Sequence, residues 1–434
     1  GDPPRPVVRL DPRGGGAAAA VRPPGVRVVL DARPLQEPDR APTTAAYLGS
    51  LLAAYDASPL EGESFAFLLG SDLDDPTASL ARLSVVGRRL LPPTRLLRSG
   101  ALTVDPFVLR GASLGAAWRA ERGGAAGAVY HAAGGGVPLL SRIPTVVTLL
   151  DLAPWELPHA YQRGTATRFG QRLRAQLLRD AAAVIVGTPA VASAARRLLH
   201  LRRDRVHLVP LAARPEFRPL AAETANVRVE RERLGLPPRY LVYSGRYDAR
   251  QDLSTLLRAL ADLAARGRPA SLSDDAPWPP RLLLVGASPD DRAAVARAAA
   301  REGVGESLAY APALPTERLA TLVAGARAAI LPVVSEAAGL AAVEAIASGT
   351  PVVASAVGAL PDIVGTAGIL VEPRDPGRLA VALATAWSDD GIHEGLVAAA
   401  MDRARGDRRT WLDVAADTRR VYAAVGVRPL QRSA

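Results

Sequence analysis

Two glutamates, Glu336 and Glu344, are the residues of this chain whose type and spacing most favour chemistry. They follow a short apolar run at 330–334, and the alanine-rich segment that holds them predicts a turn and then a helix ending near Gly349. The first backbone N–H groups of such a helix, together with the helix dipole, favour an anionic group. Taken alone, the pair also fits a first-turn residue that complements the dipole and an ordinary surface charge.

A second group of residues follows the apolar run at 239–244, where Gly245 and Arg246 precede Arg250 and Gln251. A glycine and a base at the carboxyl end of a strand suit the binding of a phosphate. The alternative is that both arginines are exposed charges in a loop.

The stretch from Ser335 to Ser355 resembles the retaining nucleotide-sugar glycosyltransferases of family four, the glycosyl transferases group 1, which have the GT-B fold. The positions that match the family pattern are Glu336, Gly339, Leu340, Glu344, Ala345, Gly349, Pro351, Val352 and Val353. The resemblance implies that Glu336 contacts hydroxyls of the donor sugar and that Glu344 holds the ribose. It also implies that the backbone amides of Ala338, Gly339 and Leu340 lie near the donor sugar and its phosphates.

The same family has a G-R pair, a short loop and a lysine at the first strand of the second half, where the two bases neutralise the donor diphosphate. Gly245 and Arg246 match the pair, whereas Gln251 occupies the position of the lysine. Because a neutral amide cannot neutralise the diphosphate, we expect the adjacent Arg250 to supply the second positive charge.

The first half resembles the family less closely. In TVVTLLDL the family usually has T-x-H-D-L, and here Leu150 stands at the histidine position, followed by Asp151. We expect Asp151, grouped with Glu336 and Arg246 as a catalytic candidate, and Trp155 to form the pocket wall; capping of the next turn is the alternative for Asp151. His131, at the end of GAVYH, is expected at the cleft or, equally, as a structural histidine.

The loop after the first predicted strand lacks the G-x-G that many relatives carry there. It has Thr43 and Thr44 instead, whose hydroxyls can either contact a ligand or cap the following helix.

Apolar strand runs alternate with helical segments from Gly25 onward, and the alternation restarts at Arg239. This order predicts an α/β fold of two Rossmann-like domains whose parallel sheets face a cleft, as in GT-B proteins. The expected divisions are a flexible leader at 1–24, an N-terminal acceptor-side domain at 25–213, a linker at 214–238, a C-terminal nucleotide-sugar-binding domain at 239–405, and a C-terminal helix at 406–434 that crosses back to the first domain.

Composition excludes several classes of protein. The chain of 434 residues has no cysteine, which rules out disulfides and thiolate metal sites and fits a reducing, cytoplasmic location. The five histidines form no close pair, so we expect neither a metal nor a cofactor besides the donor. The net charge of +10 comes from arginines spread along the chain, with few aromatic residues, so we expect no nucleic-acid binding.

One basic and apolar stretch of the first half, at 87–122, interleaves arginines with leucines, Phe107 and Trp118. Arginines attract phosphate headgroups while apolar side chains enter the interface, so this stretch suits peripheral contact with an anionic membrane. A solvated helix face is the alternative. No stretch is long and apolar enough to predict a transmembrane helix.

The function expected from the resemblance is transfer of a sugar, with retention, from a nucleotide diphosphate sugar to a hydroxyl acceptor, with lipid-linked or polysaccharide acceptors considered. Leu150, Gln251 and the missing glycines motivate a different class, a catalytically degenerate sugar-nucleotide binder or scaffold. A GT-B epimerase or hydrolase is the third possibility.

Overall fold

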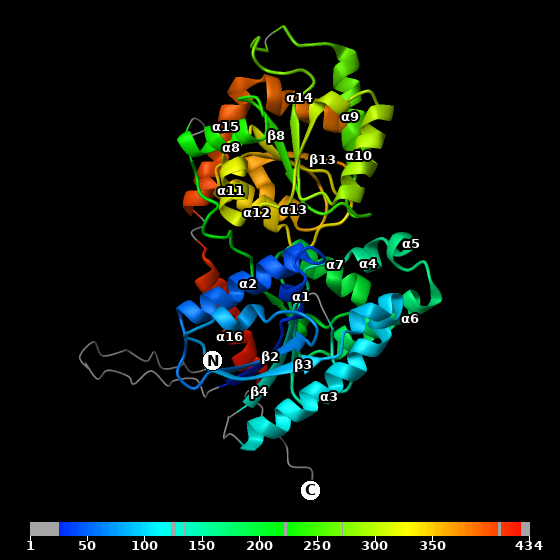
Figure 1. Cartoon of the computed structure of the whole chain (residues 1–434), viewed down its shortest axis with the longest axis vertical. Helices are drawn as coiled ribbons and strands as arrows, with labels where there is room; N and C mark the ends of the chain where they lie inside the picture. The colour runs from blue at the N-terminus through cyan, green and yellow to red at the C-terminus, as the bar shows by residue number, and fades with distance from the viewer. Residues whose placement is uncertain are drawn as a thin grey trace, which may run out of the picture.

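The computed structural model describes residues 26–122, 127–133, 136–220, 224–270, 272–406 and 409–426. It contains two parallel sheets, of seven strands in the order β3-β2-β1-β4-β5-β6-β7 and of six strands in the order β10-β9-β8-β11-β12-β13. Helices flank both sheets, and the two domains lie end to end (Figure 1). The predicted α/β class with two Rossmann-like domains is therefore confirmed.

The first sheet consists of β1 (Val26–Asp31), β2 (Ser64–Gly70), β3 (Val85–Leu91), β4 (Gly127–Ala133), β5 (Thr145–Thr148), β6 (Ala183–Val186) and β7 (Val206–Leu208). The second consists of β8 (Leu241–Ser244), β9 (Leu282–Val285), β10 (Leu308–Ala311), β11 (Ala328–Leu331), β12 (Val352–Ser355) and β13 (Gly368–Val371). The helices of the first half are α1 (Arg33–Gln36), α2 (Pro42–Ala57), α3 (Ala101–Arg122), α4 (Ala153–Glu156), α5 (Pro158–Tyr161), α6 (Thr165–Asp180) and α7 (Pro189–Leu199). Those that follow are α8 (Ala225–Arg233), α9 (Leu253–Arg266), α10 (Pro289–Arg301), α11 (Thr316–Ala324), α12 (Leu340–Ala347), α13 (Leu360–Val364), α14 (Pro376–Ser388), α15 (Asp390–Gly406) and α16 (Trp411–Gly426).

The central strands are short, wholly buried runs of apolar residues. The strands β5, β6, β11 and β12 have no exposed position, as expected of parallel strands that are covered on both faces. The strand order reverses between β1 and β4 in the first sheet and between β8 and β11 in the second. Ligands of open parallel sheets bind at such reversals, beyond the carboxyl ends of the strands.

The last helix, α16, packs on the first domain although it follows the second domain in sequence. Figure 1 shows it in red beside the strands of the first sheet, and it contacts α2 and β4. Its Trp411 and Tyr422 belong to the same core as Tyr55 of α2, and the Tyr55 hydroxyl donates to the Tyr422 hydroxyl at 3.2 Å. Arg419 forms a bidentate ion pair with Glu63, at 3.0 and 2.7 Å.

The segment at 214–238, expected as a linker, contains a helix that belongs to the second domain. Helix α8 packs on α11, and its Val227 is completely buried. Phe217 and Leu236 join the core of the second domain as well. The chain therefore passes from the first domain to the second shortly after β7. The expected leader at 1–24 lies outside the described residues.

Within the described residues, no helix is long and apolar enough to cross a membrane. In the basic and apolar stretch, Leu90 and Phe107 are 61% and 55% exposed. The nearby Arg88 is paired with Asp75 at 2.6 Å. The side chains of Arg98 and Trp118 lie outside the described part of the chain.

Candidate active site

Glu336 lies in the turn between β11 and α12, as the sequence predicts, and its carboxylate fixes that turn. Its Oε1 accepts hydrogen bonds from the backbone N–H groups of Ala338 and Gly339, at 3.0 and 2.8 Å. Gly339 has a φ of +66°, and a Cβ at this position would overlap the side chain of Ile363. Glycine is thus favoured there by its backbone conformation, while the end of the Ile363 side chain could move aside.

The carboxyl group of Glu336 responds to opposing influences. Burial raises its pKa, while the two backbone N–H groups and the charge of Arg250 oppose that rise. The amides of Ala338 and Gly339, which the resemblance assigns to the donor, are therefore engaged by Glu336 itself. The same contacts favour its charged form.

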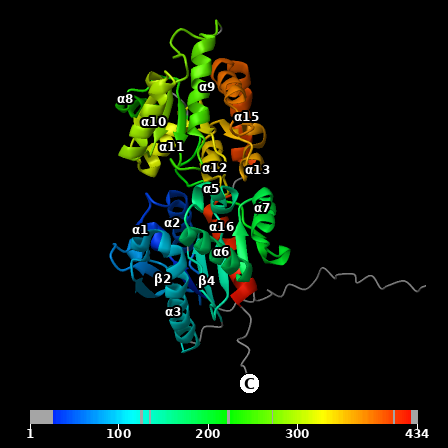
Figure 2. The ribbon, with the colours of Figure 1, turned by 90° about the vertical axis from the view of Figure 1, so that its right-hand side faces the viewer.

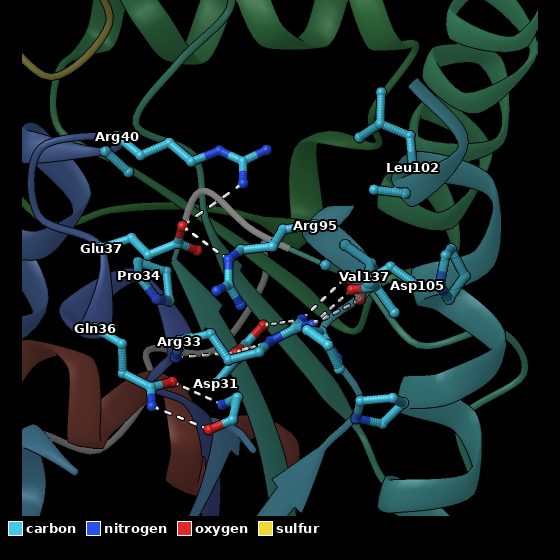
Figure 3. Close-up of a pocket in the computed structure, with 18 of the residues that line it drawn as sticks. Asp31, Arg33, Pro34, Gln36, Glu37, Arg40, Arg95, Leu102, Asp105 and Val137 are labelled. Carbon is cyan, nitrogen blue, oxygen red and sulfur yellow. Dashed lines mark hydrogen bonds and ion pairs between the residues drawn. The ribbon is translucent and has the colours of Figure 1, made fainter. Parts of the chain in front are cut away.

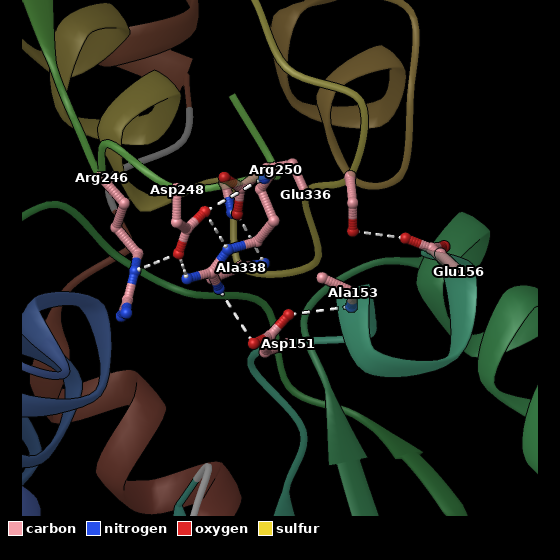
Figure 4. Close-up of polar contacts among 10 residues, drawn as sticks. Asp151, Ala153, Glu156, Arg246, Asp248, Arg250, Glu336 and Ala338 are labelled. Atoms are coloured by element: carbon pink, nitrogen blue, oxygen red, sulfur yellow. Dashed lines mark hydrogen bonds and ion pairs between the residues drawn. The ribbon is translucent and has the colours of Figure 1, made fainter. Parts of the chain in front are cut away.

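The two arginines after β8 are both held by one carboxylate, Asp248. Arg246 donates from Nε to Asp248 at 2.9 Å, and Arg250 donates from Nε to the same side chain at 3.1 Å (Figure 4). Burial raises the pKa of Asp248, but the hydrogen bond and charge of Arg250 outweigh it and bring that pKa to about 2. The two cations predicted for a diphosphate therefore lie side by side around an ionised carboxylate.

Asp151 of the first domain completes this cluster from across the domain interface. Its carboxylate pairs with Nη1 of Arg250 at 2.9 Å and accepts the backbone N–H of Ala153 at 2.9 Å (Figure 4). The structure thus gives Asp151 the cap on the next turn that was one of its two expected roles, together with an ion pair to Arg250 across the domain interface. Its place in a pocket wall stays a prediction.

Other contacts also join the domains at this face, where α12 and α13 lie opposite α5 and α7 (Figure 2). The Ser335 hydroxyl donates to Glu156 at 2.5 Å, and Asp362 accepts the backbone N–H of Ala190 at 3.0 Å. Leu150, at the position of the missing histidine, is buried in one hydrophobic cluster with Ala338 and Leu340. An apolar contact therefore occupies the place where the family has a polar side chain.

Gln251 follows Arg250 in sequence. Its backbone forms an isolated antiparallel β-bridge with Val333. Its side-chain oxygen is buried and finds no hydrogen-bond partner within the described residues. The same holds for the indole nitrogen of Trp155, which is half-buried in the wall of the first domain. Buried polar atoms of this kind ordinarily find a partner in a bound ligand or in water.

Glu344 is almost completely buried on α12, and its carboxylate is bound by Arg214, which lies at the start of the segment expected as a linker. The guanidinium donates from Nε at 2.5 Å and from Nη2 at 3.0 Å, and its Nη1 donates to Thr316 at 3.1 Å. Burial raises the pKa of Glu344, and the hydrogen bonds and charge of Arg214 oppose that rise, whereas Glu216 adds to it. Arg214 therefore holds the carboxylate in place and favours its charged form.

Replacing Arg214 with glutamine is expected to make donor binding depend on pH. Without the cation, the pKa of Glu344 rises further, so the carboxyl takes up a proton as pH falls. A ribose bound there, as the resemblance implies, would then lose a charged acceptor. Titration calorimetry with the nucleotide should show an affinity lower by about tenfold, and a further decline as the pH is lowered. The wild type and Arg202→Gln, which alters the exposed ion pair with Asp204, should change little. If the nucleotide affinity of Arg214→Gln does not depend on pH, Arg214 does not control the ionisation of Glu344.

The structure places His131 away from any cleft, contrary to the first of its two expected roles. Its ring is fully buried between the Tyr422 hydroxyl, 2.6 Å from Nδ1, and the Thr148 hydroxyl, 2.9 Å from Nε2. Burial lowers its pKa to about 3, so the ring is neutral. His131 joins α16 to β5 instead.

Thr43 and Thr44 lie in the first turn of α2, which begins at Pro42. The capping position belongs to Ala41, which forms no side-chain cap, so the capping role foreseen for the threonines is wrong. Both are half-buried at the end of the helix that faces the second domain.

Comparison with known proteins shows the family and the fold. Residues 238–389 match the family model described as glycosyl transferases group 1. A D-inositol 3-phosphate glycosyltransferase of Xylanimonas cellulosilytica is 31% identical over 298 residues, which is 66% of each chain. An enzyme of the same name from a Nocardioides species is 35% identical over 222 residues, 48% of this chain and 45% of its own. The matched region thus spans about half to two thirds of these relatives.

Solved structures resemble the whole described chain in fold. A sucrose-phosphate synthase from Thermosynechococcus elongatus covers 92% of this chain and 98% of its own, with a TM-score of 0.67 and 21% identity. The Anabaena protein HepE, solved in complex with UDP-glucose, covers 92% of this chain and 98% of its own, with a TM-score of 0.63 and 15% identity. At such identities the likeness establishes the two-domain architecture alone.

Proposed function

Since the chain belongs to the glycosyl transferases group 1 family, we propose that it transfers a sugar from a nucleotide diphosphate sugar to a hydroxyl acceptor with retention of configuration. The observation that carries the proposal is the meeting of Arg246, Arg250 and Glu336 beyond the carboxyl ends of β8 and β11, opposite Asp151 of the first domain. A glycosyl diphosphate needs this combination, cations for the phosphates beside a carboxylate for the sugar hydroxyls.

Each residue has a role in this proposal. Arg246 and Arg250 exchange Asp248 and Asp151 for the oxygens of the diphosphate. Glu336 accepts hydrogen bonds from hydroxyls of the sugar, and Glu344, oriented by Arg214, accepts those of the ribose. The arginines then neutralise the charge on the departing diphosphate. The proposal includes no metal ion.

The step itself exchanges one bond at the anomeric carbon. The bond from this carbon to the diphosphate oxygen breaks, and a bond to the acceptor oxygen forms on the same face of the ring. The hydroxyl proton of the acceptor passes to the departing diphosphate. The arginines lower the barrier because negative charge grows on the leaving group as the bond breaks.

A sugar-nucleotide binder without turnover is the second candidate, favoured by two observations. Leu150 fills the histidine position with an apolar contact, and Arg250 is already satisfied by Asp151 and Asp248. A diphosphate has to displace these carboxylates before the arginines can bind it. A tight, unreactive complex would follow if the displacement left the domains unable to close.

The test is to incubate the full chain with UDP-glucose, UDP-N-acetylglucosamine, GDP-mannose and ADP-glucose, and to follow free nucleotide by chromatography. Nucleotide release from one of them, faster than in buffer, supports the transferase, because slow transfer to water accompanies transfer to an acceptor. Calorimetric binding without release, whatever hydroxyl compound is added, supports the binder. Absence of binding with every donor would refute both.

The cytoplasm is the location proposed with this reaction, and the absence of cysteine supports it. Peripheral contact with an anionic membrane is supported by the exposed Leu90 and Phe107, which lie in a stretch rich in arginine.

A further inference from the structure

Tyr161, the last residue of α5 in the first domain, carries a buried hydroxyl group. No atom of the described residues offers this hydroxyl a hydrogen bond of good geometry. Native proteins leave few buried polar groups in this state, and such a group ordinarily meets a ligand or a water molecule. Because α5 faces the second domain (Figure 2), a ligand bound between the two domains is the partner to consider.

The charged groups that act on this hydroxyl belong to the cluster at the end of β8. Burial raises the pKa of Tyr161 to about 12, the charge of Arg250 opposes the rise, and Asp248 and Asp151 add to it. The phenol is therefore neutral near pH 7 and keeps its proton for donation in a hydrogen bond. It lies beside the carboxylate of Asp248, the anion that binds the two arginines of the proposed diphosphate site.

Asp248 marks a position where an anion fits. Its carboxylate accepts Nε of Arg246 at 2.9 Å, Nε of Arg250 at 3.1 Å and the backbone N–H of Arg250 at 3.1 Å. A phosphate that takes over these arginines places its oxygens in the same region. The hydroxyl of Tyr161 then lies next to a phosphate oxygen.

The short helices α4 and α5 are fixed at the domain interface. Asp151 accepts the first backbone N–H of α4 at 2.9 Å, and Gln162, just after α5, donates from Nε2 to the carbonyl oxygen of Pro154 at 2.7 Å. Ser335 of the second domain donates to Glu156, the last residue of α4, at 2.5 Å. These contacts hold α5 in place, so its phenol is a preorganised donor opposite the arginines.

The hydroxyl belongs to the domain interface and not to the cavity of the first domain. This cavity, of about 310 Å³, surrounds Arg33, which pairs with Asp31 at 2.7 Å and with Asp105 at 2.6 Å (Figure 3). Arg174 of α6 lines the cavity, whereas Tyr161 does not. A ligand of the cavity would therefore contact Arg174, and a ligand of the arginines after β8 would contact Tyr161.

We propose that Tyr161 is a further catalytic residue of the transfer reaction, and that its hydroxyl donates a hydrogen bond to the sugar-bearing phosphate of the donor. The inference rests on the proposed function. The sugar-bearing phosphate is the one concerned because Arg250, which acts on Tyr161, also acts on Glu336, the residue proposed for the sugar. The phenol keeps its proton throughout and stabilises the negative charge that grows on this phosphate as its bond to the anomeric carbon breaks.

Tyr161→Phe removes this hydroxyl and nothing else. With the donor from which the wild type releases nucleotide fastest, kcat should fall about 10- to 100-fold, the effect of losing a hydrogen bond to a charged group. Thermal unfolding should show a Tm no lower than that of the wild type, because no hydrogen bond within the protein is lost. A lower Tm together with the lower kcat would assign the hydroxyl to the fold and overturn the proposal.

Nucleotide binding tests which phosphate the hydroxyl contacts. Calorimetry compares UDP, GDP and ADP with UMP, GMP and AMP, and the pair that the wild type binds best is then used with the variant. Tyr161→Phe should bind the diphosphate about tenfold more weakly and the monophosphate as well as the wild type does. An equal loss for both nucleotides, or no loss for the diphosphate, would overturn the contact with the sugar-bearing phosphate.

Tyr310→Phe is the matched control. The hydroxyl of Tyr310 is likewise buried and has no hydrogen-bond partner within the described part of the chain. Tyr310 lies on β10, at the edge of the second sheet, with the guanidinium carbon of Arg292 5.0 Å from its ring centre. This variant should match the wild type in kcat, Tm and nucleotide affinity. An equal loss of diphosphate affinity in both variants would contradict a specific role of Tyr161.

The outcomes separate this inference from the proposed function. A wild type that releases nucleotide, with Tyr161→Phe equal to it in kcat and diphosphate affinity, would overturn the role of Tyr161 and leave the transfer reaction standing. A wild type that binds diphosphates without turnover would overturn the transfer reaction, and the calorimetric comparison then decides whether Tyr161 contacts the phosphate. A wild type that binds no nucleotide would refute both.

Discussion

Glu336→Gln should release nucleotide about 100-fold more slowly than the wild type, the effect typical of losing one preorganised polar contact with the transition state. One carboxylate oxygen of Glu336 accepts the N–H groups of Ala338 and Gly339. A glutamine has a single oxygen, and those N–H groups will keep it. Its amide nitrogen then faces the sugar. A hydrogen-bond donor therefore replaces the hydrogen-bond acceptor that the sugar hydroxyls require.

The measurement is the initial rate of nucleotide release at saturating donor, with Glu302→Gln as the matched control. Glu302 belongs to the same domain, and its nearest cation is Arg258 at 3.7 Å. Circular dichroism should show both variants folded, because the glutamine oxygen can still fix the turn before α12. A Glu336→Gln protein as active as the control would exclude Glu336 from the sugar site.

Arg250→Leu is expected to lower nucleotide release by about 100- to 1,000-fold, equivalent to roughly 3–4 kcal/mol of transition-state stabilisation. Arg250 is the second cation available to the diphosphate, since Gln251 stands at the position of the family lysine. The substitution also leaves Asp151 and Asp248 near each other with less positive charge between them, which opposes the approach of a third anion. The donor KM should therefore rise as kcat falls.

Asp151→Asn distinguishes two ways in which Arg250 can act. If Arg250 serves the diphosphate, this variant frees its Nη1 from the 2.9 Å ion pair, and nucleotide release should stay close to the wild-type rate or increase. If Arg250 serves only to hold the domains together, the two variants should lose activity equally. Small-angle scattering of both variants reports the domain arrangement and provides the independent readout.

The positions of Glu336, Arg246 and Arg250 at the ends of strands could be predicted because each depends on a short local segment. A single strand-turn-helix unit contains the buried strand, Glu336, Gly339 and the helix that holds Glu344. Arg246 and Arg250 likewise follow the end of one strand. A short segment with a fixed backbone geometry determines these positions, so its pattern of residue types suffices.

The rest depends on contacts between residues that are remote in sequence. Arg214 reaches Glu344 across 130 positions, and Arg33 reaches Asp105 across 72. His131 looked like a strand-terminal site residue, yet its partner Tyr422 lies 291 positions away. The sequence around Arg214, VPLAARPEFRPL, has Glu216 and Arg218 close by and therefore carried no clear signal for the pairing with Glu344.

The return of α16 to the first domain has a consequence for biosynthesis. Tyr55 and Tyr422 are 367 positions apart, so the core around α2 lacks α16 until residues 411–426 have been translated. The second domain can fold while the first still exposes the groove that α16 will fill. A nascent chain that stops before residue 409 should therefore depend on chaperones at this groove, and an isolated first domain should need α16 supplied as a peptide.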